Sequence, residues 1–486
     1  MQKIFRHSII LPVAALYLYV AGSAPFLGQW DSFDYLKQIV SHTLSPLGFG
    51  RVVYLGYNIL LWESTKRVFH LEPLRVEGVV MIGTVLLGVF GVLLFRALAG
   101  RFLSPPASRM AALAFAISPM YAVYSGFIMT EVPMLVALMS SALLLLKTGR
   151  RHPALTDAYS GILFGMAVGI REQAITMSAA FLWILFSRRE SKKPVHSILL
   201  FGGAAVTAAL LPVLWIYFLD PSGFIKKTVI WLHAIPMGQI QFWNNIQASF
   251  LYTLAICPAA WIAAGAAGLY ILFKRRPSVF PNERVSLEPS VRNPILGVFC
   301  SIIVPVVALW RDADIQIHPR YALIALPGSL IFCSSVYDRW IRSRRGPAIW
   351  AIVHVLFLGS ALVIFSPFRQ VQNEKMHFAE AVRNAVPGKA LMIAGSYSPI
   401  FDYYRGIGVR PQWQILWTGW DWKPGAAENL IRKSWADQIP VYMIEDPLGW
   451  RYFESEYLHF RFFFKDCKKK AVVPKFYRIY PDPWNP

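Results

Sequence analysis

Long apolar runs separated by short polar segments dominate this chain. A helix needs roughly 17–25 apolar residues to cross a bilayer, and eleven runs approach that length. The pattern therefore predicts an α-helical polytopic membrane protein with about 11 transmembrane helices. The predicted spans lie near residues 8–27, 76–95, 108–126, 132–147, 157–171, 173–187, 196–219, 250–273, 294–310, 321–337 and 347–366.

The basic residues predict the orientation of these spans. Clusters of Lys and Arg near residues 96–109, 147–151, 188–193, 274–276 and 339–345 fall on the same side as the N-terminus. The positive-inside rule makes that side cytoplasmic, and an odd number of spans places the C-terminus outside. The net charge of +21 then reflects topology, and no nucleic-acid partner is expected. The segment AGSA at 21–24 resembles a signal-peptide cleavage site, but the long first run favours a retained span.

Four segments of this arrangement lie outside the membrane, one of them a very short turn at 127–131. The first outer loop, 28–75, contains a mixed apolar and charged stretch at 51–69 that suits an interfacial helix, as does 224–235 within the second outer loop, 220–249. The tail, 367–486, alternates strand-like runs (389–395, 412–419, 440–446) with helical ones (398–406, 425–438). We therefore expect a transmembrane module, 1–366, followed by a small C-terminal α/β extracytoplasmic domain, 367–486.

Acidic residues at the outer ends of the spans have two interpretations each. Asp31 fits the N-cap of a helix beginning at Ser32, with Asp34 at its third position. A carboxylate beside an apolar interface also suits a catalytic base. Glu131 opens a span and Thr130 fits its N-cap, so capping and chemistry both explain it.

Basic and aromatic residues on the same side are candidates for binding an anionic headgroup. Arg171 interrupts two apolar runs, either as a hairpin turn paired with Glu172 or as a partner of a lipid phosphate. Arg320 can grip phosphate oxygens in a bidentate manner or, with Tyr321, anchor the interface. Tail tryptophans (Trp413, Trp417, Trp420, Trp422) suit a packed core better than sugar stacking. The remaining candidates for binding the lipid phosphate are Lys226, Lys227 and His318.

These motifs, in this order, resemble the GT-C superfamily. They are WDSFDY at 30–35, MTEVP at 129–133, GILFGMAVGIR at 161–171 and HPRY at 318–321, followed by LP at 326–327. The WDS segment is similar to that of mannosyltransferases related to GPI-anchor assembly. The resemblance implies that Asp31, or Asp34, activates the acceptor hydroxyl. It further implies that Glu131 is the later acidic residue and that Arg320 faces the phosphate.

The resemblance implies a membrane glycosyltransferase, a hexosyltransferase that moves mannose or a similar hexose from a polyprenyl-phosphate donor to a glycan, lipid or protein acceptor. A single base with no covalent intermediate predicts inversion. The chain needs no cofactor for this chemistry, although it is compatible with a divalent metal. A transporter or flippase is the alternative, disfavoured because the charges cluster at one face and no repeat is visible. With no retention signal or Asn-x-Ser/Thr pattern, a bacterial inner membrane is favoured.

Overall fold

A computed structural model of the chain describes residues 2–23, 30–43, 50–146, 152–186, 194–219, 221, 224–225, 257–262, 265, 323–341, 346–416, 423–450 and 453–481. The predicted span 294–310 and most of 250–273 lie outside these ranges. The chain forms two compact units. The first comprises Met1–Pro25, Pro46–Tyr57 and Val80–Phe365, and the second Phe26–Ser45, Asn58–Val79 and Ser366–Pro486.

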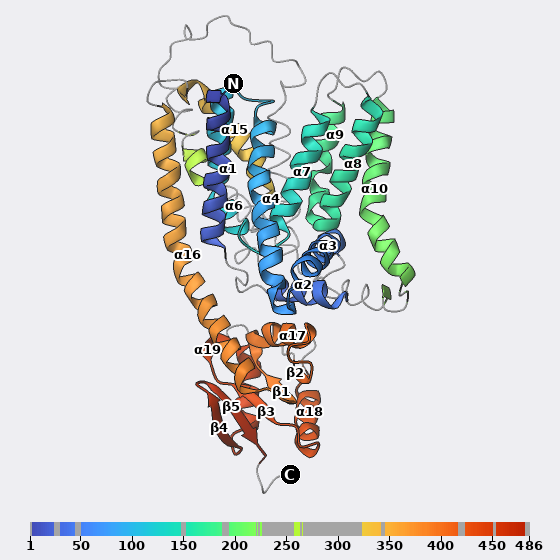
Figure 1. Ribbon diagram of the computed structural model, residues 1–486, viewed down its shortest axis with the longest axis vertical. Helices are drawn as coiled ribbons and strands as arrows, with labels where there is room; N and C mark the ends of the chain where they lie inside the picture. The colour runs from blue at the N-terminus through green and yellow to red at the C-terminus, as the bar shows by residue number, and fades with distance from the viewer. Residues whose placement is uncertain are drawn as a thin grey trace, which may run out of the picture. The chain divides into compact units, whose positions relative to one another are not determined.

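Helices make up the described part of the first unit (Figure 1). In this part of the chain, three segments are long and apolar enough to cross a membrane: Pro73–Ala99, Pro153–Ile170 and Val195–Trp215. Large apolar side chains of α10, such as Leu199 and Phe218, are exposed, as expected for a surface that meets lipid. The helices are α1 (Gln2–Gly22), α4 (Val76–Ala99), α5 (Pro105–Ile117), α6 (Pro119–Tyr124), α7 (Glu131–Leu145), α8 (Pro153–Ile170), α9 (Ser178–Phe186), α10 (Pro194–Leu219) and α15 (Leu326–Ile341).

Two predicted spans differ in detail from the observed helices. The run 108–126 is divided into α5 and α6 at Ser118, whose ψ of 124° ends α5. Pro119 follows it, and a proline pushes the residue before it out of the helical region. The run 173–187 begins as a short 3-10 helix, η3 (Glu172–Met177), before α9 starts at Ser178. Both of these predicted runs, 108–126 and 173–187, are therefore helical but interrupted.

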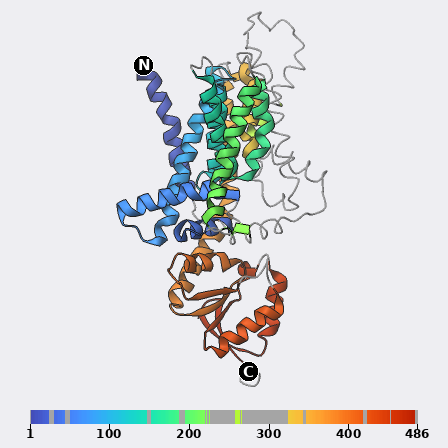
Figure 2. The same ribbon diagram turned by 90° about the vertical axis from the view of Figure 1, so that its right-hand side faces the viewer.

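Small residues bring α8 and α10 into close contact, side by side in Figures 1 and 2. A Cβ atom on Gly161 would lie 2.2 Å from the carbonyl oxygen of Phe201, and one on Gly165 would lie 2.1 Å from that of Ala205. Glycine is therefore required at both positions for this packing. The glycines of the GILFGMAVGIR motif thus have a structural function, which is to seat α8 against α10.

Paired serines join α8 to α7 on another side. The Ser141 hydroxyl donates to the carbonyl oxygen of Ser160 at 2.8 Å, and the Ser160 hydroxyl donates to that of Ser141 at the same distance. A hydrogen bond between membrane helices typically contributes about 0.6–2 kcal/mol. Helix α8 is therefore held against both α7 and α10. The start of α7 and the end of α8 carry the first candidate site described below.

The second unit contains α2 (Trp30–Ser41), most of α3 (Val52–Phe69) and a five-stranded sheet in the order β2-β1-β3-β5-β4. Strands β1 (Ala390–Ile393), β2 (Trp413–Leu416) and β3 (Val441–Ile444) are parallel. Strand β5 (Phe476–Tyr480) pairs with β3 in the antiparallel direction, and the edge strand β4 (Lys468–Val473) pairs antiparallel with β5. Helices α17 (Ser398–Gly406) and α18 (Pro424–Ala436) pack on these strands. The remaining helices are α19 (Pro447–Trp450) and α20 (Glu454–Phe463).

The predicted strands and helices of the tail are confirmed, whereas α20, β4 and β5 were not foreseen. Strand β4 reads KKKAVV, and its three lysines are exposed. A charged edge strand protects a sheet from further pairing, and this composition hides it from a search for apolar runs. Trp413 is buried and its indole donates to the carbonyl oxygen of Val386 at 3.1 Å. It belongs to the core, and Trp417, Trp420 and Trp422 lie outside the described residues.

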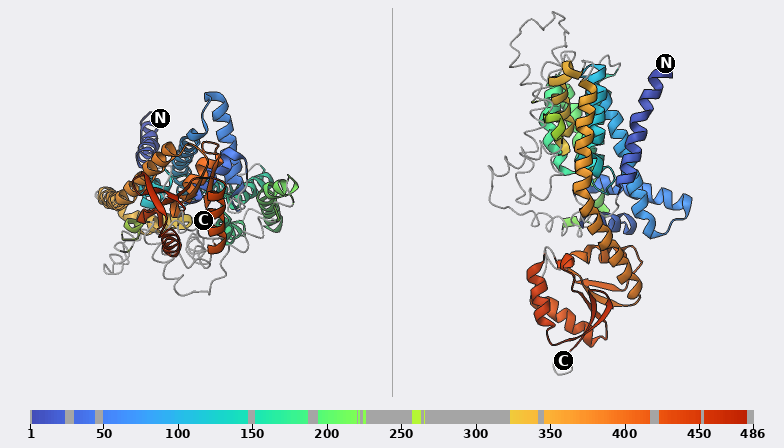
Figure 3. Two further views of the ribbon diagram at one scale, coloured as in Figure 1. Left: turned by 90° about the horizontal axis from the view of Figure 1, so that it is seen from below. Right: turned by 90° about the vertical axis from the view of Figure 1, so that its left-hand side faces the viewer.

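The last predicted span is much longer than expected. Helix α16 runs unbroken for 40 residues, Gly346–Ala385, and is drawn as one continuous orange helix in Figure 3. The boundary placed between 366 and 367 from the sequence falls within this helix, next to the division of the two units after Phe365. Its polar second half (QVQNEKMHFAEAVRNA) belongs to the second unit.

Candidate functional site

A buried ion pair joins the start of α7 to the end of α8 in the first unit. The Arg171 Nη1 atom donates to Glu131 Oε1 at 2.5 Å and to the Thr130 hydroxyl at 2.8 Å, and its Nε atom donates to Gln173 Oε1 at 2.9 Å. The Glu131 and Arg171 side chains are only 1% and 2% exposed. Two charges in such a place stabilise each other because each is otherwise costly to bury.

Local structure explains why these residues meet. Helix α8 ends at Ile170, and Arg171 is extended, with φ −157° and ψ 121°, which turns its side chain away from the helix path. Helix α7 begins at Glu131 as predicted, but Thr130 makes no side-chain cap and has helical backbone angles. The Thr130 hydroxyl accepts from Arg171. The capping function predicted for Thr130 is therefore wrong, because its helical backbone angles do not suit an N-cap and its side chain makes no cap bond.

The neighbouring charges extend this cluster. Glu172 pairs with Arg51 at 3.5 Å, so the hairpin pair predicted between Arg171 and Glu172 is replaced by Arg171 with Glu131. A Cβ atom on Gly169 would lie 2.5 Å from Val53 Cγ2, so the last glycine of the motif lets the start of α3 approach α8. The glycine motif therefore positions the charged residues at this end of the helices.

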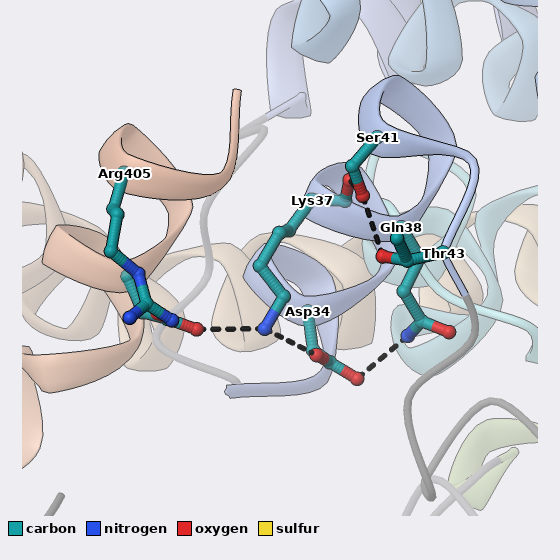
Figure 4. Close-up of polar contacts among 7 residues, drawn as sticks. Asp34, Lys37, Gln38, Ser41, Thr43 and Arg405 are labelled. Carbon is teal, nitrogen blue, oxygen red and sulfur yellow. Dashed lines mark hydrogen bonds and ion pairs between the residues drawn. The ribbon is translucent and has the colours of Figure 1, made fainter. Parts of the chain in front are cut away.

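Asp31 and Asp34 lie on α2 in the second unit. The helix begins at Trp30, which places Asp31 within the first turn and not at the N-cap of a helix that starts at Ser32. The predicted capping arrangement is therefore wrong in register. Asp34 lies one turn further on, where Oδ2 accepts from Gln38 Nε2 at 2.7 Å and Oδ1 lies 3.3 Å from Lys37 Nζ (Figure 4). Asp34 is thus held by contacts along its own helix.

Lys37 links α2 to α17. Its Nζ atom lies 2.7 Å from Asp402 Oδ2, and Arg405 Nη2 lies 2.5 Å from Asp402 Oδ1. Burial acts to lower the pKa of Lys37, but Asp34 and Asp402 outweigh it and raise that pKa above its usual value. The ammonium group therefore stays charged at neutral pH. Sequence analysis missed Lys37, Asp402 and Arg405. Only the fold, which brings α2 and α17 together, reveals that these residues contact each other.

The other predicted site residues lie outside the described part of the chain. These are Lys226, Lys227, His318, Arg320 and Tyr321. Within the described residues, no three His, Cys, Asp or Glu side chains gather closely enough to hold a metal ion. The described site residues therefore form one group in each unit: Glu131 with Arg171 in the first, and the carboxylates of α2 with Lys37 in the second.

Comparisons with known proteins found one matching family model and several similar folds. Residues 74–216 match the family model described as dolichyl-phosphate-mannose-protein mannosyltransferase. No curated protein sequence matches the chain. The structure is similar to that of ArnT from Cupriavidus metallidurans bound to undecaprenyl phosphate, with a TM-score of 0.64, 12% identity and coverage of 97% of both chains.

A second solved structure has a similar fold. The archaeal oligosaccharyltransferase AglB from Archaeoglobus fulgidus, in complex with an inhibitory peptide and a dolichol-phosphate, matches with a TM-score of 0.53 and 12% identity, over 99% of this chain and 75% of that one. At such identity these likenesses establish the fold. The family match over residues 74–216 and these folds agree with the resemblance predicted from the sequence motifs, and three described segments are long and apolar enough to cross a membrane.

Proposed function

We propose that this protein is a polyprenyl-phosphate-dependent glycosyltransferase that moves mannose or a similar hexose to an acceptor on the extracytoplasmic face of the membrane. The observation that carries the proposal is a fold shared with ArnT over 97% of both chains. It is joined by a mannosyltransferase family match over residues 74–216. The acceptor is a glycan, a lipid or a protein, and the membrane is a bacterial inner membrane with the N-terminus in the cytoplasm.

In the proposed reaction, Asp31 is the base. It accepts the proton of the acceptor hydroxyl while that oxygen bonds to the anomeric carbon. The bond from that carbon to the lipid phosphate breaks on the opposite side, so the sugar configuration inverts and polyprenyl phosphate leaves. Asp31 is chosen over Asp34 because of its position in the WDS segment at 30–32.

Two further groups complete the proposed machinery. Glu131 supplies a second carboxylate, and its ion pair with Arg171 holds that carboxylate in one position. Positive charge must meet the departing phosphate because it develops there in the transition state. We assign that function to Arg320, with Lys226, Lys227, His318 and Tyr321 as further contacts. Arg171 is already bonded to Glu131, so its proposed function shifts from binding phosphate to orienting that carboxylate.

The Asp31→Asn substitution tests the base. We expect it to lower sugar transfer by about 10²–10⁴-fold, the usual contribution of a general base, with little change in melting temperature. The assay uses full-length protein in nanodiscs, radiolabelled undecaprenyl-phosphate hexoses as donors and an envelope extract as acceptor. Asp34→Asn is the matched control and should lose less activity.

Three outcomes would count against the proposal. Retained sugar transfer by the Asp31→Asn protein would show that Asp31 is not the catalytic base. A large fall in melting temperature with normal specific activity would indicate that Asp31 only stabilises the first turn of α2. Movement of the lipid-linked sugar across proteoliposomes without transfer to any acceptor would favour the transporter alternative.

A further inference from the structure

One lysine connects two elements of the second unit that are far apart in sequence. Lys37 on α2 and Asp402 on α17 are separated by 365 residues, yet their side chains are hydrogen-bonded at 2.7 Å. The Asp402 side chain is 4% exposed and that of Lys37 is 21% exposed. The same ammonium group lies 3.3 Å from Asp34. It therefore binds a carboxylate of its own helix and one of the C-terminal domain at once.

The backbone of α17 is shaped around this lysine. A Cβ atom on Gly406 would lie 2.3 Å from Lys37 Cγ and 2.7 Å from its Cδ atom. Any larger residue at 406 would push the lysine stem aside. Next to this contact, the rings of Phe33 and Tyr403 pack with centroids 6.0 Å apart. The stem of Lys37 is thus held by packing and its charged end by two carboxylates.

We propose that Lys37 is a positioning residue through which the C-terminal domain holds α2, and with it Asp31, in the geometry that the reaction requires. This inference rests on the proposed function of Asp31. In it, Asp402 anchors Lys37, Lys37 holds Asp34, and the first turn of α2 stays in place. Neither Lys37 nor Asp402 touches the substrate in this arrangement.

The length of α2 explains why such an anchor matters. The helix has only 12 residues, and an isolated helix shorter than about 12–15 residues is marginal in water. Its order must come from what it packs against. A displacement of a catalytic group by about 1 Å can cost about 10²-fold in rate. A loosened α2 would therefore slow the chemical step while leaving the lipid donor bound as before.

The test compares Lys37→Met, Lys37→Arg and Asp402→Asn proteins, each full length in nanodiscs, with undecaprenyl-phosphate hexoses as donors. We expect Lys37→Met and Asp402→Asn each to lower kcat about 10- to 100-fold, with the KM for the donor changed by less than about threefold. The double variant should be no slower than the slower single variant, because both remove the same link. Lys37→Arg should recover much of kcat, since it keeps the charge.

Amide hydrogen exchange supplies a readout that does not need activity. We expect peptides covering residues 30–41 to exchange faster in Lys37→Met protein, because α2 opens more readily without its anchor. The matched control is Lys469→Met, which breaks a lysine–carboxylate pair with Glu445 elsewhere in the same domain. It should change neither kcat nor the exchange of α2.

Specific results would overturn the inference. These are a Lys37→Met kcat within about twofold of the native value, multiplicative losses in the double variant, or unchanged exchange of residues 30–41. If Asp31→Asn protein stays active, the proposed function fails. The exchange data would still decide separately whether Lys37 holds α2.

Discussion

The two units each contain a cation clamped by a carboxylate, but the surroundings of the two pairs differ. In the first unit, Arg171 and Glu131 are 2% and 1% exposed, and Arg171 also bonds a hydroxyl and an amide. In the second unit, Lys37 is 21% exposed while its partner Asp402 is 4% exposed. The arginine pair is sealed among helices that meet lipid, whereas the lysine pair retains some access to water.

This difference predicts how each pair responds when it is broken. A sealed charge that loses its partner has no water to replace it, so the loss is large. A charge near the surface can recover part of its solvation, so the loss is smaller. Arginine suits the sealed place because its guanidinium can donate several hydrogen bonds in a fixed plane. Lysine suits the second place because a flexible stem can reach two carboxylates.

The Arg171→Met substitution should give the largest loss of stability. It leaves Glu131 buried with its main cationic partner removed, which typically costs about 3–5 kcal/mol. Denaturation of the purified protein in detergent measures the effect. Removing the charge at both positions, as Glu131→Gln with Arg171→Met, should recover much of the loss. If the double variant is as unstable as Arg171→Met alone, desolvation is not the cause.

The Lys37→Met substitution should have an intermediate effect, about 1.5–3 kcal/mol near neutral pH, as for hydrogen bonds to charged groups. The pKa of Lys37 is raised in the folded protein. The stability it adds is therefore fully present below the unfolded lysine pKa of about 10.4. It is lost as the pH rises through the folded value.

Melting temperatures of the native and Lys37→Met proteins, recorded from about pH 7 to about pH 11.5 across the lysine range, check this dependence. The difference in melting temperature between the two proteins should be constant near neutral pH and should narrow only at the alkaline end of the range. A difference in melting temperature that widens as the pH rises toward about 10.4 would mean that the pKa of Lys37 is lowered. The stabilising effect of Asp34 and Asp402 on the charge would then be refuted.

The smallest effect is expected for Lys469→Met. Its ion pair with Glu445 is partly exposed, at 28% and 25%, and pairs of this kind contribute about 0.2–1 kcal/mol. Chemical denaturation measures the free energy of unfolding of this variant for comparison with Arg171→Met and Lys37→Met. The three variants then form a series ordered by the burial of the ion pair. A loss from Lys469→Met equal to that from Arg171→Met would break the proposed relation between burial and effect.

The sequence located the members of the sealed pair but not their pairing. Glu131 and Arg171 each interrupt apolar runs, so their charges are conspicuous, and 40 residues separate them. The glycine motif at 161–171 was visible too, and the structure explains it by the contacts of α8 with α10 and α3. Such local patterns can be recognised in the sequence because a regular helix brings residues at fixed spacings onto the same face.

The second pair was invisible for a physical reason. Lys37 occurs in a polar helix and Asp402 in another, and neither charge is unusual where it stands. Only the fold brings the two together, and no spacing rule spans 365 residues. The same limit applies to α16, whose apolar half was predicted as a span. Its polar half, from 366 to 385, has no apolar run that would indicate a continuing helix.

The long separation between Lys37 and Asp402 also has a consequence for biosynthesis. A ribosome that has just translated α2 still has most of the chain to make before the aspartate appears. Until then the short helix lacks its anchor, and a chain cut off before α17 never acquires it. Under the mechanism proposed above, such unfinished products would reside in the membrane as inert fragments, unable to draw on the cell's pool of lipid-linked sugar.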